Sequence, residues 1–121
     1  MPGEGPASEL LRLFGVTRPL FIALGDERRQ EIIVFLLESG AARSVGDVAA
    51  RLGLSQPATS HHLKILRDAS LLTVQRIGAQ RRYAPNGAEY ARLLAPLRDL
   101  TATIIACAAA PDHPDAASGG R

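Results

Sequence analysis

The apolar residues of this chain recur mainly at spacings of three and four, the pattern typical of amphipathic helices. The clearest case is residues 44–52, whose apolar positions are Val45, Val48, Ala49 and Leu52. Ser44 is a suitable N-cap for this segment, and Asp47 is favourable at its positive amino end. Gly53 follows and supplies the backbone freedom for a sharp turn. The pattern therefore predicts a short helix that ends in a turn at Gly53.

A second helix is predicted to follow this turn, with Ser55 as its N-cap and Pro57 in its first turn. One arc is formed by Ala58, His62, Ile65, Leu66 and Ala69, with Thr59 and Leu63 beside it. The opposite arc carries Gln56, Ser60, Lys64 and Arg67, with Pro57 and His61 at its edge. Two helices joined in this way predict a helix-turn-helix whose polar row can reach base edges and phosphates. An ordinary amphipathic surface helix is the alternative.

After Ser70 the pattern changes to that of strands, at residues 71–77 and 80–84. Gly78 and Ala79 lie between them and predict a hairpin turn. The hairpin would carry Arg76, Gln80, Arg81 and Arg82 near its tip, as a basic wing beside the second helix. Strand alternation separates Arg81 and Tyr83 from Arg82, and we expect Tyr83 to pack rather than to contact DNA. A solvated charged hairpin is the alternative.

Four further helices are predicted outside this region, over residues 7–16, 17–24, 27–39 and 88–110. Thr17 is expected to cap the second of them and Asp26 the third. In the third helix the residues expected to face inward are Ile32, Ile33, Phe35, Leu36 and Leu37. Residues 40–43 are expected to form a loop. Pro96 is expected to kink or interrupt the last helix near residues 93–95.

The last helix has a strong apolar stripe but is separated from the core by the hairpin. We therefore expect it to pair with the same helix of a second chain, braced by the first helix. The predicted dimer interface consists of Leu10, Leu11, Phe14, Leu93, Leu97, Leu100 and Ile104. Packing over the core of the same chain is the alternative.

Composition indicates one aliphatic, mainly helical domain with a small β-hairpin wing. The 121 residues are 46% hydrophobic but only 4% aromatic. We expect a flexible N-terminus over residues 1–6, the folded domain over 7–110, and a disordered tail over 111–121. The net charge of +2 is unevenly distributed, because residues 55–84 carry five Lys and Arg against one Asp. This local excess falls on the second helix and hairpin, where phosphates would bind.

The sequence disfavours several other classes of protein. Cys107 is the only cysteine, so no intrachain disulfide can form. No apolar run is long enough to span a membrane, and residues 1–11 do not resemble a signal peptide, so we expect a cytoplasmic location. An enzyme is also not expected, because no nucleophile–base pair, phosphate-binding glycine loop or cluster of metal ligands is found.

Residues 20–85 resemble the ArsR/SmtB family of bacterial winged-helix repressors. The resemblance is carried by LFIALGDERRQEIIVFLLE, by SVGDVAARLGLSQPATSHHLKILRDASLL and by VQRIGAQRRYAP. It implies a homodimer that binds an inverted-repeat operator in double-stranded DNA, represses its own or a neighbouring operon, and is released by an effector. The predicted DNA contacts are Ser55, Gln56, Thr59, Ser60, His61, Lys64, Arg76, Gln80, Arg81 and Arg82. A winged-helix module for protein contacts, without specific DNA binding, is the alternative.

The residues do not match the metal sites of this family, so no metal or cofactor is expected and the effector is unidentified. The segment of residues 44–47 has no thiol. Asp99, Thr101, Asp112 and Asp115 have comparable spacing to a second type of site, but this set contains no imidazole or thiolate. Cys107 fits a thiol sensor less well than a small apolar filler. We expect His62 to be a hydrogen-bonded core residue, His61 to face outward, and His113 to be inert.

Overall fold

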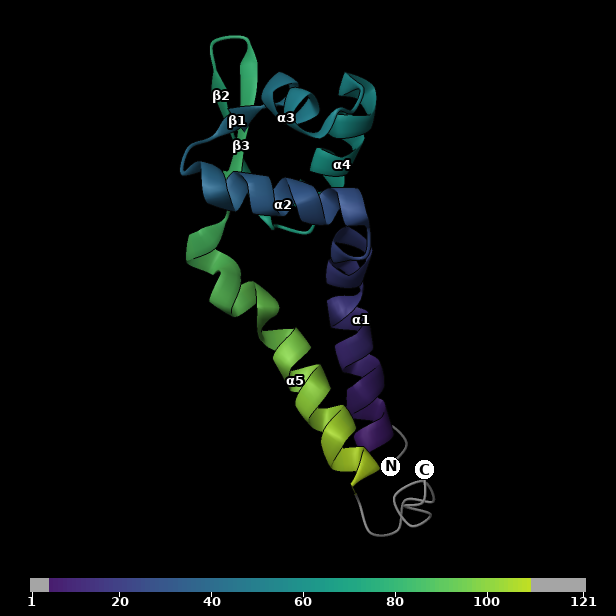
Figure 1. Ribbon diagram of the computed structural model, residues 1–121. Coiled ribbons are helices and arrows are strands. Elements are labelled where there is room, and N and C mark those ends of the chain that lie inside the picture. Colours follow the sequence, from purple (N-terminus) through teal and green to yellow (C-terminus); the bar gives the residue numbers. More distant parts are fainter. Residues whose placement is uncertain (1–4, 110–121) are drawn as a thin grey trace. The chain divides into compact units, whose positions relative to one another are not determined.

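The computed structural model describes residues 5–109 (Figure 1). The helices are α1 (Pro6–Leu24), α2 (Glu27–Ser39), α3 (Val45–Leu52), α4 (Gln56–Asp68), a 3-10 turn η1 (Gly87–Glu89) and α5 (Tyr90–Ala108). The strands are β1 (Arg43–Ser44), β2 (Leu72–Ile77) and β3 (Gln80–Pro85). The mainly helical winged helix-turn-helix is therefore confirmed. The predicted tail, the first four residues and His113 lie outside the described residues.

The chain divides into two compact units. One contains α1 up to Arg18 and α5 from Leu94 onward, and the other contains residues 19–93. The second unit holds the helix-turn-helix and the hairpin, and it is called the winged unit below. The first is called the helical unit. The predicted boundaries of a single folded domain stay a prediction.

The helix ends of the winged unit follow from local chemistry. The Asp26 side chain accepts a hydrogen bond from the Arg29 backbone N–H and caps α2. Ser44 and Asp47 form a reciprocal capping box at the start of α3. Gly53 ends α3 with φ +69°, a left-handed conformation that glycine adopts at low cost. These predicted ends of α2 and α3 are confirmed.

The sheet has three antiparallel strands in the order β1-β3-β2. Gly78, with φ +63°, begins the two-residue turn between β2 and β3, as predicted. The expected loop over residues 40–43 was partly wrong, because Arg43 pairs with Tyr83 and Ser44 with Arg82. These pairs join residues 40 and 38 positions apart, so local sequence does not reveal them.

The core of the winged unit is aliphatic. Its fully buried side chains include Ile32 and Leu36 from α2, Val48 from α3, and Leu63 and Leu66 from α4. Burying each such side chain stabilises the fold by about 1.5–3 kcal/mol. The expectation for α2 was wrong at one position, since Leu37 is 55% exposed. The five residues expected to face inward fall within positions 32–37, and so many neighbouring positions cannot all lie on one face of a helix.

The helical unit corrects two expectations about helix boundaries. α1 begins at Pro6 and runs without a break through Thr17, which was expected to cap a new helix. The Thr17 hydroxyl instead donates to the Leu13 carbonyl oxygen one turn back, at 2.8 Å. α5 runs through Pro96, so the helix is not interrupted there, and the alternative expectation of a kink stays a prediction. Within residues 5–109, no helix is long and apolar enough to cross a membrane.

Candidate nucleic-acid interface

The polar face of α4 is available to solvent in the winged unit. The exposed side chains on it are Gln56, Ser60, His61 and Lys64. Ser55 is exposed too, but its hydroxyl accepts from the Ala58 N–H at 3.2 Å and caps the helix. Together these residues form one row of hydrogen-bonding groups along the exposed face of α4. Such a row is suited to the edges of bases in a major groove.

One predicted contact was wrong. Thr59 is fully buried, and its hydroxyl donates to the Ser55 carbonyl oxygen at 2.8 Å. The side chain therefore faces the core and satisfies its polar atom within its own helix, as threonine can do at this spacing. Residue type suggested a DNA contact at this position, but helical phase places it on the inner arc.

Lys64 is the principal cation of α4, and its side chain is 65% exposed. Its ammonium group lies 3.0 Å from the Asp68 carboxylate one turn further on. The hydrogen bond from Lys64 lowers the pKa of Asp68 below its usual value, so the carboxylate is ionised at neutral pH. An exposed ion pair of this kind contributes little to stability, so Lys64 can exchange Asp68 for a phosphate at low cost.

The arginines of the hairpin lie on two faces that differ in their exposure to solvent. Arg76 and Arg81 are directly paired across β2 and β3, and both are exposed. Like charges placed opposite each other are destabilising in a sheet, so an anion bound between them would be favourable. Arg82 points to the other face, as strand alternation predicted, and is only partly exposed. It donates to the Ala42 carbonyl oxygen at 3.3 Å, so its observed role is to hold β3 against the segment before α3.

The structure brings the hairpin and the two helices together around a hollow of about 220 Å³. The hollow is lined by Ser44, Val45, Gly46, Gln56, Gln80 and Arg81. Three of these residues were predicted DNA contacts: Gln56 from α4, and Gln80 and Arg81 from β3. The start of α3 was not predicted to take part, and the only sequence signal for it was the small residue at Gly46, which leaves room beside the Gln56 amide. Figure 1 shows α3 between the hairpin and α4.

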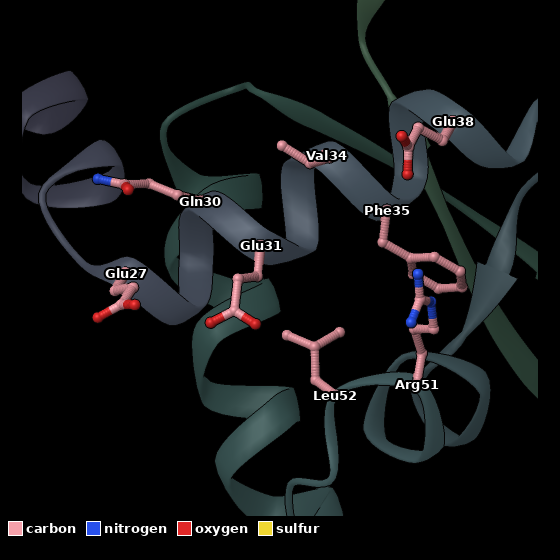
Figure 2. A pocket seen from close by; sticks show the side chains of 8 residues that line it. All are labelled: Glu27, Gln30, Glu31, Val34, Phe35, Glu38, Arg51 and Leu52. Carbon is pink, nitrogen blue, oxygen red and sulfur yellow. The ribbon is translucent and has the colours of Figure 1, made fainter.

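A second hollow, of about 320 Å³, lies on α2 and α3 (Figure 2). It is lined by Glu27, Gln30, Glu31, Val34, Phe35, Glu38, Arg51 and Leu52. The Arg51 guanidinium lies 5.6 Å from the centre of the Phe35 ring, within the range of a cation–π contact. Three carboxylates make this lining unfavourable for phosphates, so it is separate from the candidate nucleic-acid interface.

Metal ligands are not gathered anywhere in residues 5–109. No group of three or more His, Cys, Asp or Glu side chains in that range is placed to hold a metal ion. The Thr101 hydroxyl donates to the Leu97 carbonyl oxygen at 2.9 Å and is occupied within α5. Asp112 and Asp115 lie outside the described range.

Comparison with known proteins identifies the family. Residues 26–74 match the family model described as "Bacterial regulatory protein, arsR family". The chain is 38% identical over 87 residues to the arsenical resistance operon repressor of Bacillus subtilis, covering 72% of this chain and 79% of that protein. This chain belongs to the arsR family of bacterial regulatory proteins. Two other relatives are matched over less of their own length, namely the transcriptional repressor SdpR of Bacillus subtilis over 63% and the regulator CmtR of Mycobacterium bovis over 62%.

Solved structures similar to this arsR-family chain share its fold. The ArsR-like transcriptional regulator from Rhodococcus sp. RHA1 superposes with a TM-score of 0.67 at 29% identity, covering 79% of this chain and 86% of that one. The homodimeric winged helix-turn-helix DNA-binding domain of Mb0332 from Mycobacterium bovis gives a TM-score of 0.60 at 24% identity, covering 85% and 89%. The predicted family and fold are confirmed by these matches.

Proposed function

We propose that this arsR-family protein is a dimeric, sequence-specific DNA-binding repressor of its own or a neighbouring operon, released by an unidentified signal. α4 is the recognition helix and lies in the major groove. The hairpin follows the phosphate backbone. The observation that carries the proposal is the hollow where Gln56, Gln80 and Arg81 meet the start of α3, because it joins a base-reading amide to a phosphate-binding cation.

The proposed dimer pairs through the helical unit. Leu11 and Phe14 of α1 are 72% and 45% exposed, and Ile104 and Ile105 of α5 are 43% and 63% exposed. Apolar side chains gathered on the helices of one unit are typical of an interface between chains. Leu100 is already buried within the single chain, so intrachain packing accounts for it. Leu10 and Leu97 of the helical unit, and Leu93 at the last position of the winged unit, are partly exposed and remain proposed interface residues.

A dimer of this kind would bind an inverted repeat with half-sites about one helical turn, roughly 34–36 Å, apart. The protein would act in the cytoplasm and would have no catalytic role. The alternative, a module for protein contacts alone, is less favoured because the chain belongs to a family of regulatory proteins and is similar to an operon repressor.

The test begins by sequencing the genomic fragments that purified protein retains, which should yield an inverted repeat. Binding of that site is then measured by fluorescence anisotropy over a range of salt. We expect Lys64→Ala to weaken binding of all sequences and to reduce the salt slope by about 1 for each chain of the dimer. Gln56→Ala should lose about 1–3 kcal/mol of discrimination at one base step.

Arg92→Ala is the matched control for Lys64→Ala. Arg92 also forms an exposed ion pair with a nearby carboxylate, that of Glu89 in η1 at 2.7 Å, but it lies on α5. The Arg92→Ala variant should bind the operator DNA like the wild-type protein. If Lys64→Ala and Gln56→Ala also bind like wild type, the assigned contacts are wrong. If the wild type binds DNA weakly and without salt dependence, the protein-contact alternative is favoured.

A further inference from the structure

One guanidinium connects three helices of the winged unit. Arg29, near the start of α2, donates from Nε to the Ala23 carbonyl oxygen at 2.9 Å and from Nη2 to the Ile22 carbonyl oxygen at 2.8 Å. Both carbonyls belong to the last turn of α1. The remaining nitrogen, Nη1, lies 3.1 Å from Nδ1 of His62 on α4. Arg29 therefore ties the recognition helix to α1 and α2.

The contact with His62 requires a neutral imidazole. Arginine has donors only, so Nδ1 of His62 must be the acceptor and must carry no proton. Protonation at Nδ1 would place two donors and two positive charges 3.1 Å apart. The bond is therefore possible in one protonation state of His62 and lost in the other.

The surroundings of His62 favour the neutral state at neutral pH. Burial is the largest effect and lowers the pKa of His62 below its usual 6.5. The Asp26 carboxylate at the start of α2 opposes this, whereas Arg28 and Arg29 from α2 and His61 from α4 lower the pKa further. The expected hydrogen bond of His62 is present, with a partner that was not foreseen, but the expected core position is not, because the side chain is only half-buried.

Protonation should displace α4 rather than Arg29. The guanidinium keeps its two bonds to α1 whatever the state of His62, and the Arg29 backbone N–H is held by Asp26. His62 lies between exposed His61 and fully buried Leu63, so moving its ring outward shifts the polar face beside it. We propose that Arg29 and His62 are positioning residues for the recognition helix, and that protonation of His62 separates them and weakens DNA binding.

The same pair makes folding stability depend on pH. Because the pKa of His62 is lower in the folded state, the unfolded chain binds the proton more readily. The contribution of His62 to stability is therefore complete above about pH 6.5 and is lost as the pH falls below that value towards the folded-state pKa.

The test of this inference, which rests on the proposed function, uses the full chain and the operator duplex recovered by selection. Affinity is measured from pH 7.5 to pH 5.0 at constant ionic strength, with folding checked by circular dichroism. For each His62 of the bound dimer, we expect wild-type affinity to fall by up to about tenfold per pH unit below the pKa of His62. His62→Asn keeps an acceptor near the position of Nδ1 but does not titrate, so its affinity should be nearly independent of pH. If the affinity of His62→Asn falls with pH as steeply as that of the wild type, the proposal is overturned.

His61→Asn is the matched control on the same helix. It should keep the acid-dependent loss, whatever its affinity at pH 7.5, because its ring is not bonded to Arg29. A flat profile for His61→Asn would assign the effect to the wrong histidine and would also overturn the proposal.

A measurement without DNA separates this inference from the proposed function. Titration of the imidazole signals by NMR should show a higher pKa for His62 in Arg29→Gln than in wild type, because a neighbouring cation is removed. An unchanged pKa would show that the pair does not interact in solution. If the pair is present but the wild type binds no DNA at pH 7.5, the proposed function fails instead.

Discussion

Three hydroxyl groups around the helix-turn-helix all bond to backbone, with different consequences. Ser44 and Ser55 accept from N–H groups at the starts of α3 and α4. Thr59 donates to a carbonyl oxygen from inside the core. Only position along the helix separates these roles, since the side chains are chemically alike. Of the two capping serines, Ser44 is the more buried, since it is 8% exposed whereas Ser55 is an exposed residue.

At this scale we predict that Ser44→Ala lowers the free energy of unfolding by about 1 kcal/mol. The substitution removes the acceptor of the Asp47 N–H and half of the capping box. Thermal or urea unfolding measures the change. Ser60→Ala, at an exposed position inside α4, is the control and should not lower stability, since alanine favours helix. Equal losses in both variants would contradict the role assigned to the cap.

At the scale of elements, the hairpin carries two adjacent arginines with different surroundings. Arg81 is exposed and lines the hollow beside Gln56. Arg82 faces the other side of the sheet and is bonded to the segment before α3. Alternation along β3 causes this difference, because successive side chains of a strand point to opposite faces.

We predict that Arg81→Ala weakens DNA binding and reduces the salt slope by about 1 for each chain of the dimer, with little change in the free energy of unfolding. Arg82→Ala should instead lower the free energy of unfolding by about 1 kcal/mol, because a bond between β3 and Ala42 is lost. Anisotropy over a salt series and urea unfolding measure the two effects. If Arg82→Ala reduces the salt slope and Arg81→Ala lowers the free energy of unfolding, Arg82 is the phosphate contact instead.

At the scale of the whole molecule, the proposed assembly depends on side chains that a single chain leaves exposed. The helical unit presents Leu11, Phe14, Ile104 and Ile105 to solvent. Two recognition helices on one duplex need a fixed separation, and a shared interface between copies would supply it.

We predict that Phe14→Asp and Ile104→Asp convert the protein from a dimer to a monomer, because each places a charge in an apolar interface. Size-exclusion chromatography with light scattering measures the mass. Leu37→Asp, on an exposed apolar position of α2, is the control and should remain dimeric. A monomeric wild type, or dimeric Phe14→Asp and Ile104→Asp, would contradict the proposed interface.

Local chemistry was enough to predict much of the winged unit. The Asp26 and Ser44 caps, the turn at Gly53 and the hairpin turn at Gly78 were all predicted from neighbouring residues. Each depends on interactions within a few positions, which one stretch of sequence specifies. The family could also be predicted, because its motif covers this same unit.

Tertiary structure decided the features that join distant segments. The pairing of Arg43 with Tyr83, the bond from Arg82 to Ala42, and the contact between Arg29 and His62 each connect residues more than 30 positions apart. Helical phase alone could have placed Thr59 in the core. The choice of partner for His62 could not be predicted, because it depends on how α1, α2 and α4 pack, and a side chain can bond only to groups that packing brings within reach.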